Sequence, residues 1–211
     1  MTDNIRYAPF CKSCWSSITK YNGPACEICS APFSSEYSHL CGECGKRPPL
    51  FSRAICFGLY DGVLATAINV FKFQKIRRLY KPLGKLLLDL DVKGTDAVIP
   101  VPLSAKGLRE RGFNQSLLLS KFISDKTGIT LIADGLVKNS ETHSQIGLSA
   151  KERVSNLRRA FGTRKSFTGM SLLLVDDVMT TGTTVNECTK QLLKAGAEDV
   201  MVLALARARN D

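Results

Sequence analysis

The sequence predicts an α/β domain, a parallel sheet flanked by helices, preceded by a small cysteine-rich module. Two observations lead to this prediction. From residue 51 onward, short apolar runs alternate with segments of helical periodicity, which is the pattern of a parallel sheet. Before that point, six cysteines form three Cys-x-x-Cys pairs separated by polar and turn-forming residues. We therefore expect a module over residues 1–50 and a sheet domain over residues 51–211.

The elements of the sheet domain follow from apolar runs and turn signals. Asp61 and Gly62 form a turn after the first strand, and Asn114 is a typical residue for capping a helix at its N-terminus. Arg47, Pro48 and Pro49 form a stiff, non-helical link between the two parts. We expect strands at residues 54–60, 97–101, 131–133, 172–175 and 200–206, and helices at residues 63–73, 79–90, 115–126 and 185–195.

Composition narrows the class of protein. The 211 residues fit one ordinary domain plus a small module, and an apolar content of 44% is enough for a packed core. Residues 1–10 resemble no signal peptide, and no stretch has the length of a membrane-spanning helix. We expect a soluble cytoplasmic protein that does not insert into membranes.

The chain carries a net charge of +10, with basic clusters at residues 72–85, 106–111 and 151–165. Such an excess favours polyanionic partners, such as nucleotides, pyrophosphate esters or nucleic acid. The alternative for any one cluster is a solvated helix face, and charge alone does not distinguish the ligands.

The three cysteine pairs indicate a metal site. They begin 15 residues apart, and two such pairs supply the four thiolates of a tetrahedral Zn²⁺ site. The module has few apolar residues, so a structural metal would stabilise it. Disulfides are disfavoured in a protein without a secretion signal. The pairs are Cys11 and Cys14, Cys26 and Cys29, and Cys41 and Cys44.

Six paired cysteines are present where four ligands are needed. We prefer Cys26, Cys29, Cys41 and Cys44, because their spacing is that of a compact zinc ribbon. Cys11 and Cys14 could instead replace either pair, form the remnant of a second site, or hold zinc with a partner chain. His39 is a weaker alternative ligand. Cys56 lies in a predicted strand and Cys188 in a predicted helix, so we expect both to be core residues.

Residues 172–184, LLLVDDVMTTGTT, contain more groups suited to ligand binding than any other segment of the chain. A buried parallel strand is expected to end at Asp176 and Asp177, at the edge where open α/β sheets bind ligands. A small-residue loop and the N-terminus of a helix follow, and their backbone N–H groups suit a phosphate. The alternative without a ligand site is a buried strand followed by a polar turn. The loop residues are Thr180, Thr181, Gly182, Thr183 and Thr184.

This segment resembles the signature of type I phosphoribosyltransferases, which bind 5-phosphoribosyl-1-pyrophosphate. The resemblance implies that fold for the sheet domain. It also implies that Asp176 and Asp177 are catalytic residues that contact the ribose hydroxyls, that the loop 180–184 holds the 5-phosphate, and that Mg²⁺ accompanies the diphosphate. A Walker P-loop is excluded, because no Gly-Lys-Ser/Thr follows the glycine.

Nearly the whole chain resembles the ComF (ComFC/GntX-like) family, which is associated with natural competence and DNA uptake. The resemblance rests on the cysteine module leading into CGECGKRPPLFSRA, the YDG turn with its helix ending in FKF, the block IPVPLSAKGLRERGFNQS, and THSQIGLSAKERVSNLRRAF joined to the Thr loop.

Two blocks then supply further candidate residues. The loop after strand 97–101 offers Lys106, Arg109 and Arg111, whose cations suit pyrophosphate. By resemblance, residues 142–161 correspond to a hood that closes over substrate and excludes water. A solvated helix at residues 150–159 explains its polar residues equally well. The hood candidates are Gln145, Lys151, Arg153, Asn156 and Arg158.

Two classes of function remain open at this stage. The first is a phosphoribosyltransferase with an unidentified acceptor; no side chain stands out as a general base, and the only histidines are His39 and His143. The second is a non-catalytic ligand sensor of the competence machinery, whose zinc module contacts single-stranded DNA or another competence protein. Affinity for DNA that falls steeply with salt favours the second class, and acceptor-dependent release of pyrophosphate favours the first.

Overall fold

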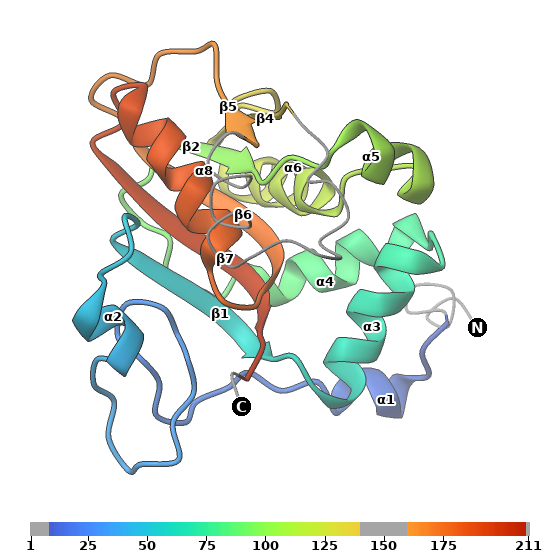
Figure 1. Ribbon diagram of the computed structural model, residues 1–211. Coiled ribbons are helices and arrows are strands. Elements are labelled where there is room, and N and C mark those ends of the chain that lie inside the picture. Colours follow the sequence, from blue (N-terminus) through green and yellow to red (C-terminus); the bar gives the residue numbers. More distant parts are fainter. Residues whose placement is uncertain (1–8, 140–159, 210–211) are drawn as a thin grey trace, which may run out of the picture.

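The computed structural model describes residues 9–139 and 160–209. A five-stranded sheet lies at the centre, with strand order β1-β7-β6-β2-β3, and all of its strand pairs are parallel (Figure 1). This confirms the predicted parallel sheet. Its strands are β1 (Arg53–Leu59), β2 (Ala97–Pro100), β3 (Thr130–Leu131), β6 (Ser171–Met179) and β7 (Asp199–Arg207).

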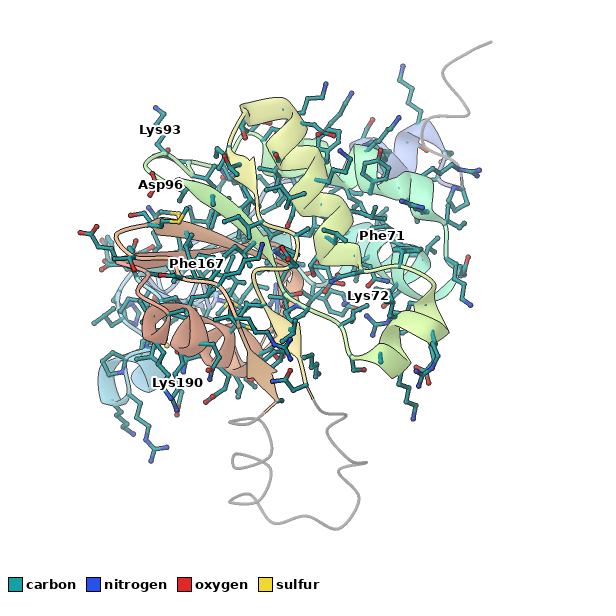
Figure 2. All side chains as sticks on the ribbon, turned by 90° about the horizontal axis from the view of Figure 1, so that it is seen from above. Phe71, Lys72, Lys93, Asp96, Phe167 and Lys190 are labelled. Carbon is teal, nitrogen blue, oxygen red and sulfur yellow. The ribbon has the colours of Figure 1, made fainter. Side chains whose placement is uncertain are left out.

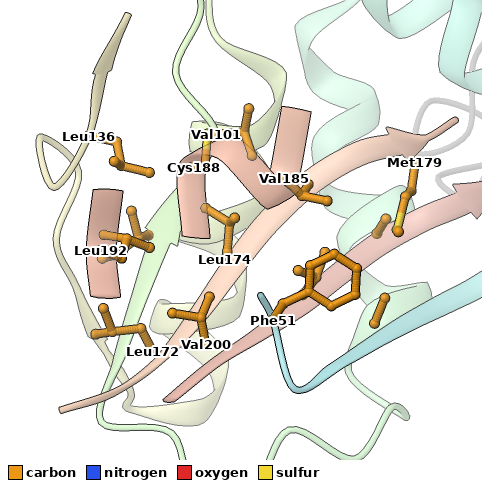
Figure 3. Close-up of a cluster of buried hydrophobic side chains, with 14 of the residues drawn as sticks. Phe51, Val101, Leu136, Leu172, Leu174, Met179, Val185, Cys188, Leu192 and Val200 are labelled. Atoms are coloured by element: carbon orange, nitrogen blue, oxygen red, sulfur yellow. The ribbon is translucent and has the colours of Figure 1, made fainter. Parts of the chain in front are cut away.

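Helices cover both faces of the sheet, as the alternation of apolar side chains along β6 requires. Leu173 and Val175 pack with α3 (Gly62–Phe73), α4 (Tyr80–Leu87) and α6 (Gln115–Thr127) on one face. Leu172 and Leu174 pack with α8 (Thr183–Lys194) on the other face (Figure 3). The continuous apolar run of β6 is therefore buried on both sides.

The order of connections creates a switch point between β2 and β6. From β2 the chain passes through α6 to the edge strand β3, whereas from β6 it passes through α8 to β7 on the other side. The two helices lie on opposite faces of the sheet. Open α/β sheets bind ligands outside the carboxyl ends of their strands at such a point.

The cysteine module packs against the α8 face and shares its core. Cys26, Cys29 and Cys44 belong to the same buried cluster as Phe51, which Figure 3 places beside Met179. The module contains two short helices, α1 (Lys12–Ser16) and α2 (Gly42–Lys46). It is also hydrogen-bonded to β1, because the amide of Ala54 donates to the carbonyl of Ile28 over 2.6 Å.

The structure differs from the sequence prediction in several elements. β6 continues four residues past its predicted end, to Met179, because β7 pairs with it over its whole length. The loop after β2 contains a helix, α5 (Ala105–Arg111). The start of the predicted helix 79–90 is a 3-10 turn, η1 (Arg77–Leu79). A short antiparallel pair that was not predicted joins β4 (Val137–Lys138) to β5 (Phe161–Gly162).

Two further expectations have different outcomes. The helix expected at residues 150–159 lies outside the described residues. Within the described ranges, no helix combines the length and the apolar character that crossing a membrane requires.

Candidate functional site

The two acids of β6 lie at the switch point. The pairing of β2 with β6 ends at Pro100 and Val175, one residue before Asp176, whereas β7 continues alongside to Met179. On one side the two acids therefore lie alongside β7, whereas on the other side they lie beyond the end of β2. In a strand that is paired on both sides, neighbouring side chains point to opposite faces, so two adjacent carboxyl groups do not reach the same ligand. Because the pairing with β2 ends before Asp176, this restriction is relieved on one side.

Asp177 is held in an ion pair that sequence reasoning missed. The Nζ of Lys72, labelled in Figure 2, lies 2.8 Å from Oδ1 of Asp177, and the side chains are 14% and 9% exposed. Lys72 lies in the last turn of α3. This helix packs on the face of the sheet to which Leu173 and Val175 of β6 belong. The sequence placed Lys72 only at the start of a basic cluster. Its pairing with an acid far along the chain depends on topology, which no local pattern contains.

Asp176 is held differently, by groups without charge. Its Oδ1 accepts a hydrogen bond from Oγ of Ser116 over 3.1 Å and another from the amide of Asp177 over 2.9 Å. Burial, reinforced by the neighbouring negative charge of Asp177, raises the pKa of Asp176 to about 7. The pair therefore combines a carboxylate balanced by a lysine with a carboxyl group that is readily protonated near neutral pH.

The loop after β6 leads directly into α8. Gly182 is the N-cap with φ +81°, a left-handed conformation that favours glycine, and no side chain caps the helix. Thr183 and Thr184 already belong to the first turn, so the helix begins two residues before its predicted start. The hydroxyl groups of Thr181 and Thr183 lie 2.8 Å apart. A helix N-terminus without a side-chain cap presents N–H donors and a partial positive charge, which suits a phosphate.

The predicted pyrophosphate cations lie on α5 rather than in a loop. Ser104 caps this helix through its Oγ, and Gly112 ends it with φ +81°. Lys106 and Arg109 are exposed. Arg111 is partly buried: its guanidinium lies 5.4 Å from the ring centre of Phe73 and donates to Gln115 over 3.4 Å.

Both contacts of Arg111 are with residues next in the chain to the partners of the two acids. Phe73 follows Lys72 in α3, and Gln115 precedes Ser116 at the start of α6. The contacts of Arg111 thus involve direct chain neighbours of Lys72 and Ser116, which hold Asp177 and Asp176. The hood candidates Gln145, Lys151, Arg153, Asn156 and Arg158 lie outside the described residues.

Four cysteines of the module meet in one cluster. The sulfur atoms of Cys26, Cys29, Cys41 and Cys44 all lie within 4.8 Å of one another. All four are free thiols, and Cys26, Cys29 and Cys44 are buried. Burial, together with the neighbouring thiols, raises the pKa of Cys44 well above its usual range. Zn²⁺ would supply the positive charge that lets such a group ionise, so this donor set fits a structural zinc.

The remaining cysteine candidates are placed elsewhere. Cys11 and Cys14 are exposed on α1 and do not join the cluster; Cys11 caps that helix through its sulfur. The ring of His39 stacks on Phe33, with 4.0 Å between ring centres, and His39 is not part of the cluster either. Cys188 is buried as expected, whereas Cys56 is only partly buried at the edge of the core.

A second residue missed by sequence reasoning connects the cysteine cluster to the loop. Arg207, at the end of β7, is 2% exposed. Its Nε donates to the carbonyl of Cys29 over 3.0 Å, and its Nη1 donates to the carbonyl of Thr180. In the sequence, Arg207 and Arg209 are two basic residues near the C-terminus, with no signal that separates one from the other.

Comparison with protein families assigns both parts of the chain. Residues 3–45 match the Double zinc ribbon domain, and residues 123–211 match the Phosphoribosyl transferase domain. These matches agree with the four-cysteine cluster of the module and with the parallel sheet flanked by helices.

Two similar proteins and one similar structure complete the comparison. A chain of the glutamine phosphoribosylpyrophosphate amidotransferase from B. subtilis is 23% identical, with a TM-score of 0.43 over 68% of this chain and 26% of that one. The DNA utilization protein YhgH of Escherichia coli K12 is 34% identical over 93% of this chain and 89% of its own length. Competence protein F of Haemophilus influenzae is 36% identical over 94% of this chain and 90% of its own length. The chain belongs to the family of Competence protein F, with a zinc-ribbon module in front of a phosphoribosyltransferase-type domain.

Proposed function

We propose that the switch-point site binds 5-phosphoribosyl-1-pyrophosphate together with Mg²⁺. The observation that carries this proposal is the position of two carboxyl groups directly before a small-residue loop and an uncapped helix N-terminus, all beside the end of β2. Carboxylates accept hydrogen bonds from ribose hydroxyls, and the N–H groups of the loop and helix suit the 5-phosphate. Arg111 is the candidate for the pyrophosphate, since a guanidinium donates to two phosphate oxygens at once.

The residues around the acids give each a separate role in binding. Lys72 balances the charge of Asp177, so this carboxylate can face a polyanionic ligand without adding a full negative charge. Ser116 and the amide of Asp177 fix the orientation of Asp176. Mg²⁺ would bind with the diphosphate of the ligand and neutralise it.

Calorimetry with the sugar diphosphate and Mg²⁺ tests this proposal. We expect saturable binding by the wild type and at least a roughly tenfold loss of affinity in the double variant Asp176→Asn, Asp177→Asn, since each loses charge-assisted hydrogen bonds. Asp125→Asn is the matched control, because Asp125 is exposed and forms its ion pair with Lys121 on the same helix, α6. Equal affinity for the double variant and the control would overturn the proposal.

We also propose that the protein acts in competence and in the use of DNA, because one relative is named Competence protein F and another DNA utilization protein YhgH. Whether the bound sugar diphosphate is transferred separates the enzyme from a ligand sensor. Acceptor-dependent release of pyrophosphate by the wild type would establish the enzyme, and binding without release across nitrogen-containing acceptors would establish the sensor.

For the module, we propose that Cys26, Cys29, Cys41 and Cys44 hold one structural Zn²⁺. The support is the closeness of the four sulfur atoms and their burial against the sheet domain. Because the cluster belongs to the core of that domain, the metal would stabilise more than the module itself.

A further inference from the structure

Arg207 is a buried cation whose hydrogen-bond partners within residues 9–139 and 160–209 are backbone carbonyl groups. Within the described residues it forms no ion pair with a carboxylate, although its side chain is 2% exposed. Burying a charge that only carbonyl dipoles compensate costs free energy of folding. We therefore look for a role of this residue other than packing. Its hydrogen-bond acceptors are the carbonyl oxygens of Cys29, Met179, Thr180 and Ala208.

Two of these acceptors belong to different candidate sites. Cys29 is one of the four clustered cysteines, and Thr180 is the first residue of the loop 180–184. The Nε of the guanidinium reaches the first and Nη1 the second. Because the guanidinium is rigid and planar, a shift of either carbonyl must be transmitted to the other or must break a hydrogen bond.

A second contact ties the far side of the loop to the last residue of the module. The amide of Leu50 donates to Oδ1 of Asn186 over 2.6 Å, and Asn186 lies in the first turn of α8. Phe51 next to it is buried with Met179 and Val185, which flank the loop (Figure 3). The loop is therefore fixed at both ends by residues that also contact the cysteine module or its link.

We propose that Arg207 is a positioning residue that couples the metal state of the four-cysteine cluster to ligand binding at the loop 180–184. A metal ion fixes the backbone of Cys29; Arg207 then holds the carbonyl of Thr180, and the N–H groups and hydroxyls of the loop keep the orientation that a phosphate needs. The coupling rests on the proposed zinc and sugar-diphosphate sites. By linkage it is reciprocal, so the ligand must also retain the metal more tightly.

The first experiment measures this reciprocity through zinc release. Zinc transfer to a colorimetric chelator is followed with and without the sugar diphosphate and excess Mg²⁺, with inorganic pyrophosphate as a control for metal binding by the ligand itself. We expect the ligand to raise the share of zinc that the wild type retains at equilibrium with the chelator, equivalent to a gain in zinc affinity of about 5-fold or more, the lower range of typical coupling. Arg207→Lys keeps the charge but loses the two-armed geometry, so it should bind one zinc yet lose this protection.

Arg209→Lys is the matched control, because Arg209 lies two residues further along the chain and its side chain is 64% exposed. It should retain full protection. Protection of the Arg207→Lys variant equal to that of the wild type would overturn the coupling, as would a lack of protection in wild-type protein that binds the ligand in calorimetry. No binding in calorimetry would instead overturn the proposed function, and with it the ligand half of the coupling.

Hydrogen exchange tests the metal half without any variant or ligand. We expect removal of zinc from the full chain to accelerate amide exchange at residues 180–186 by roughly tenfold or more, the size of a local opening of about 1.4 kcal/mol. The amides of α6, which packs on the opposite face of the sheet, should change little. Unchanged exchange at residues 180–186, or equal acceleration in α6, would overturn the coupling.

Discussion

The Nζ of Lys72 lies 2.8 Å from Oδ1 of Asp177, and both side chains are largely buried where α3 meets the end of β6. This contact joins the first helix of the sheet domain to the acidic pair of the proposed ligand site. A buried ion pair of this kind leaves an uncompensated charge when one partner is removed. Lys72 therefore contributes both to the stability of the fold and to the electrostatic state of the site.

The first prediction concerns this pair. Lys72→Met should lower the free energy of unfolding by about 3 kcal/mol, because Asp177 remains buried without a partner. Adding Asp177→Asn to that variant should restore part of the loss. Lys121→Met is the control, since its pair with Asp125 is 61% and 55% exposed and should contribute less than about 0.5 kcal/mol. Urea denaturation measures all four proteins, and equal losses for the two lysine variants would contradict the prediction.

The second prediction concerns pH. The pKa of Asp176 is raised to about 7 in the folded protein, whereas an unfolded aspartate titrates near about 4. Between these values the folded state binds a proton that the unfolded state does not, so this group makes stability fall as pH rises. Asp176→Asn removes this pH-dependent loss of stability. The loss amounts to about 1.4 kcal/mol for each unit by which the folded and unfolded pKa values differ.

The variant should therefore gain stability relative to the wild type between pH 5 and pH 8, as measured by urea denaturation at both values. Asp125→Asn, on the exposed side of α6, should show no comparable gain. A constant difference between Asp176→Asn and the wild type at the two pH values would show that Asp176 is ionised throughout.

The sequence predicted the sheet well because its strands are apolar runs bounded by turn residues. β2 and β7 differ from their predicted bounds by at most one residue, and Asn114 caps α6 through its side chain as expected. α5 was missed because its seven residues include five charged or glycine positions in place of an apolar stripe, although Ser104 and Gly112 are typical cap residues.

The candidate site was predicted less completely, for a physical reason. A motif names the residues of one segment, here Asp176 to Thr184, but the partners of those residues come from distant segments. Lys72, Ser116 and Arg207 reach the site through the order of strands and the faces that their helices cover. No periodicity or spacing in a single segment encodes such contacts.

The third prediction separates backbone strain from ligand binding. Gly182→Ala should lower stability by about 1 kcal/mol, because φ is +81° there, and the added Cβ would lie 2.8 Å from the Cε of Met179. Gly169→Ala is the matched control: φ is +71°, and its Cβ would meet nothing within 4 Å. Both should lose stability in thermal unfolding, but Gly182→Ala alone should lose affinity for the sugar diphosphate. Equal affinities would contradict a role of this loop in binding.

The fourth prediction concerns the number of zinc ions. Residues 1–25 contain Cys11 and Cys14 as their only cysteines or histidines, two of the four ligands that a tetrahedral site needs. The other two pairs already meet in one cluster. Elemental analysis of purified protein should therefore find one zinc per chain in the wild type and in Cys14→Ser. Cys44→Ser should lose the metal and expose the core to proteolysis, because Cys44 is buried in the cluster shared with Phe51 and Leu174. Two zinc ions per chain, or loss of zinc in Cys14→Ser, would show that the first pair is also a ligand.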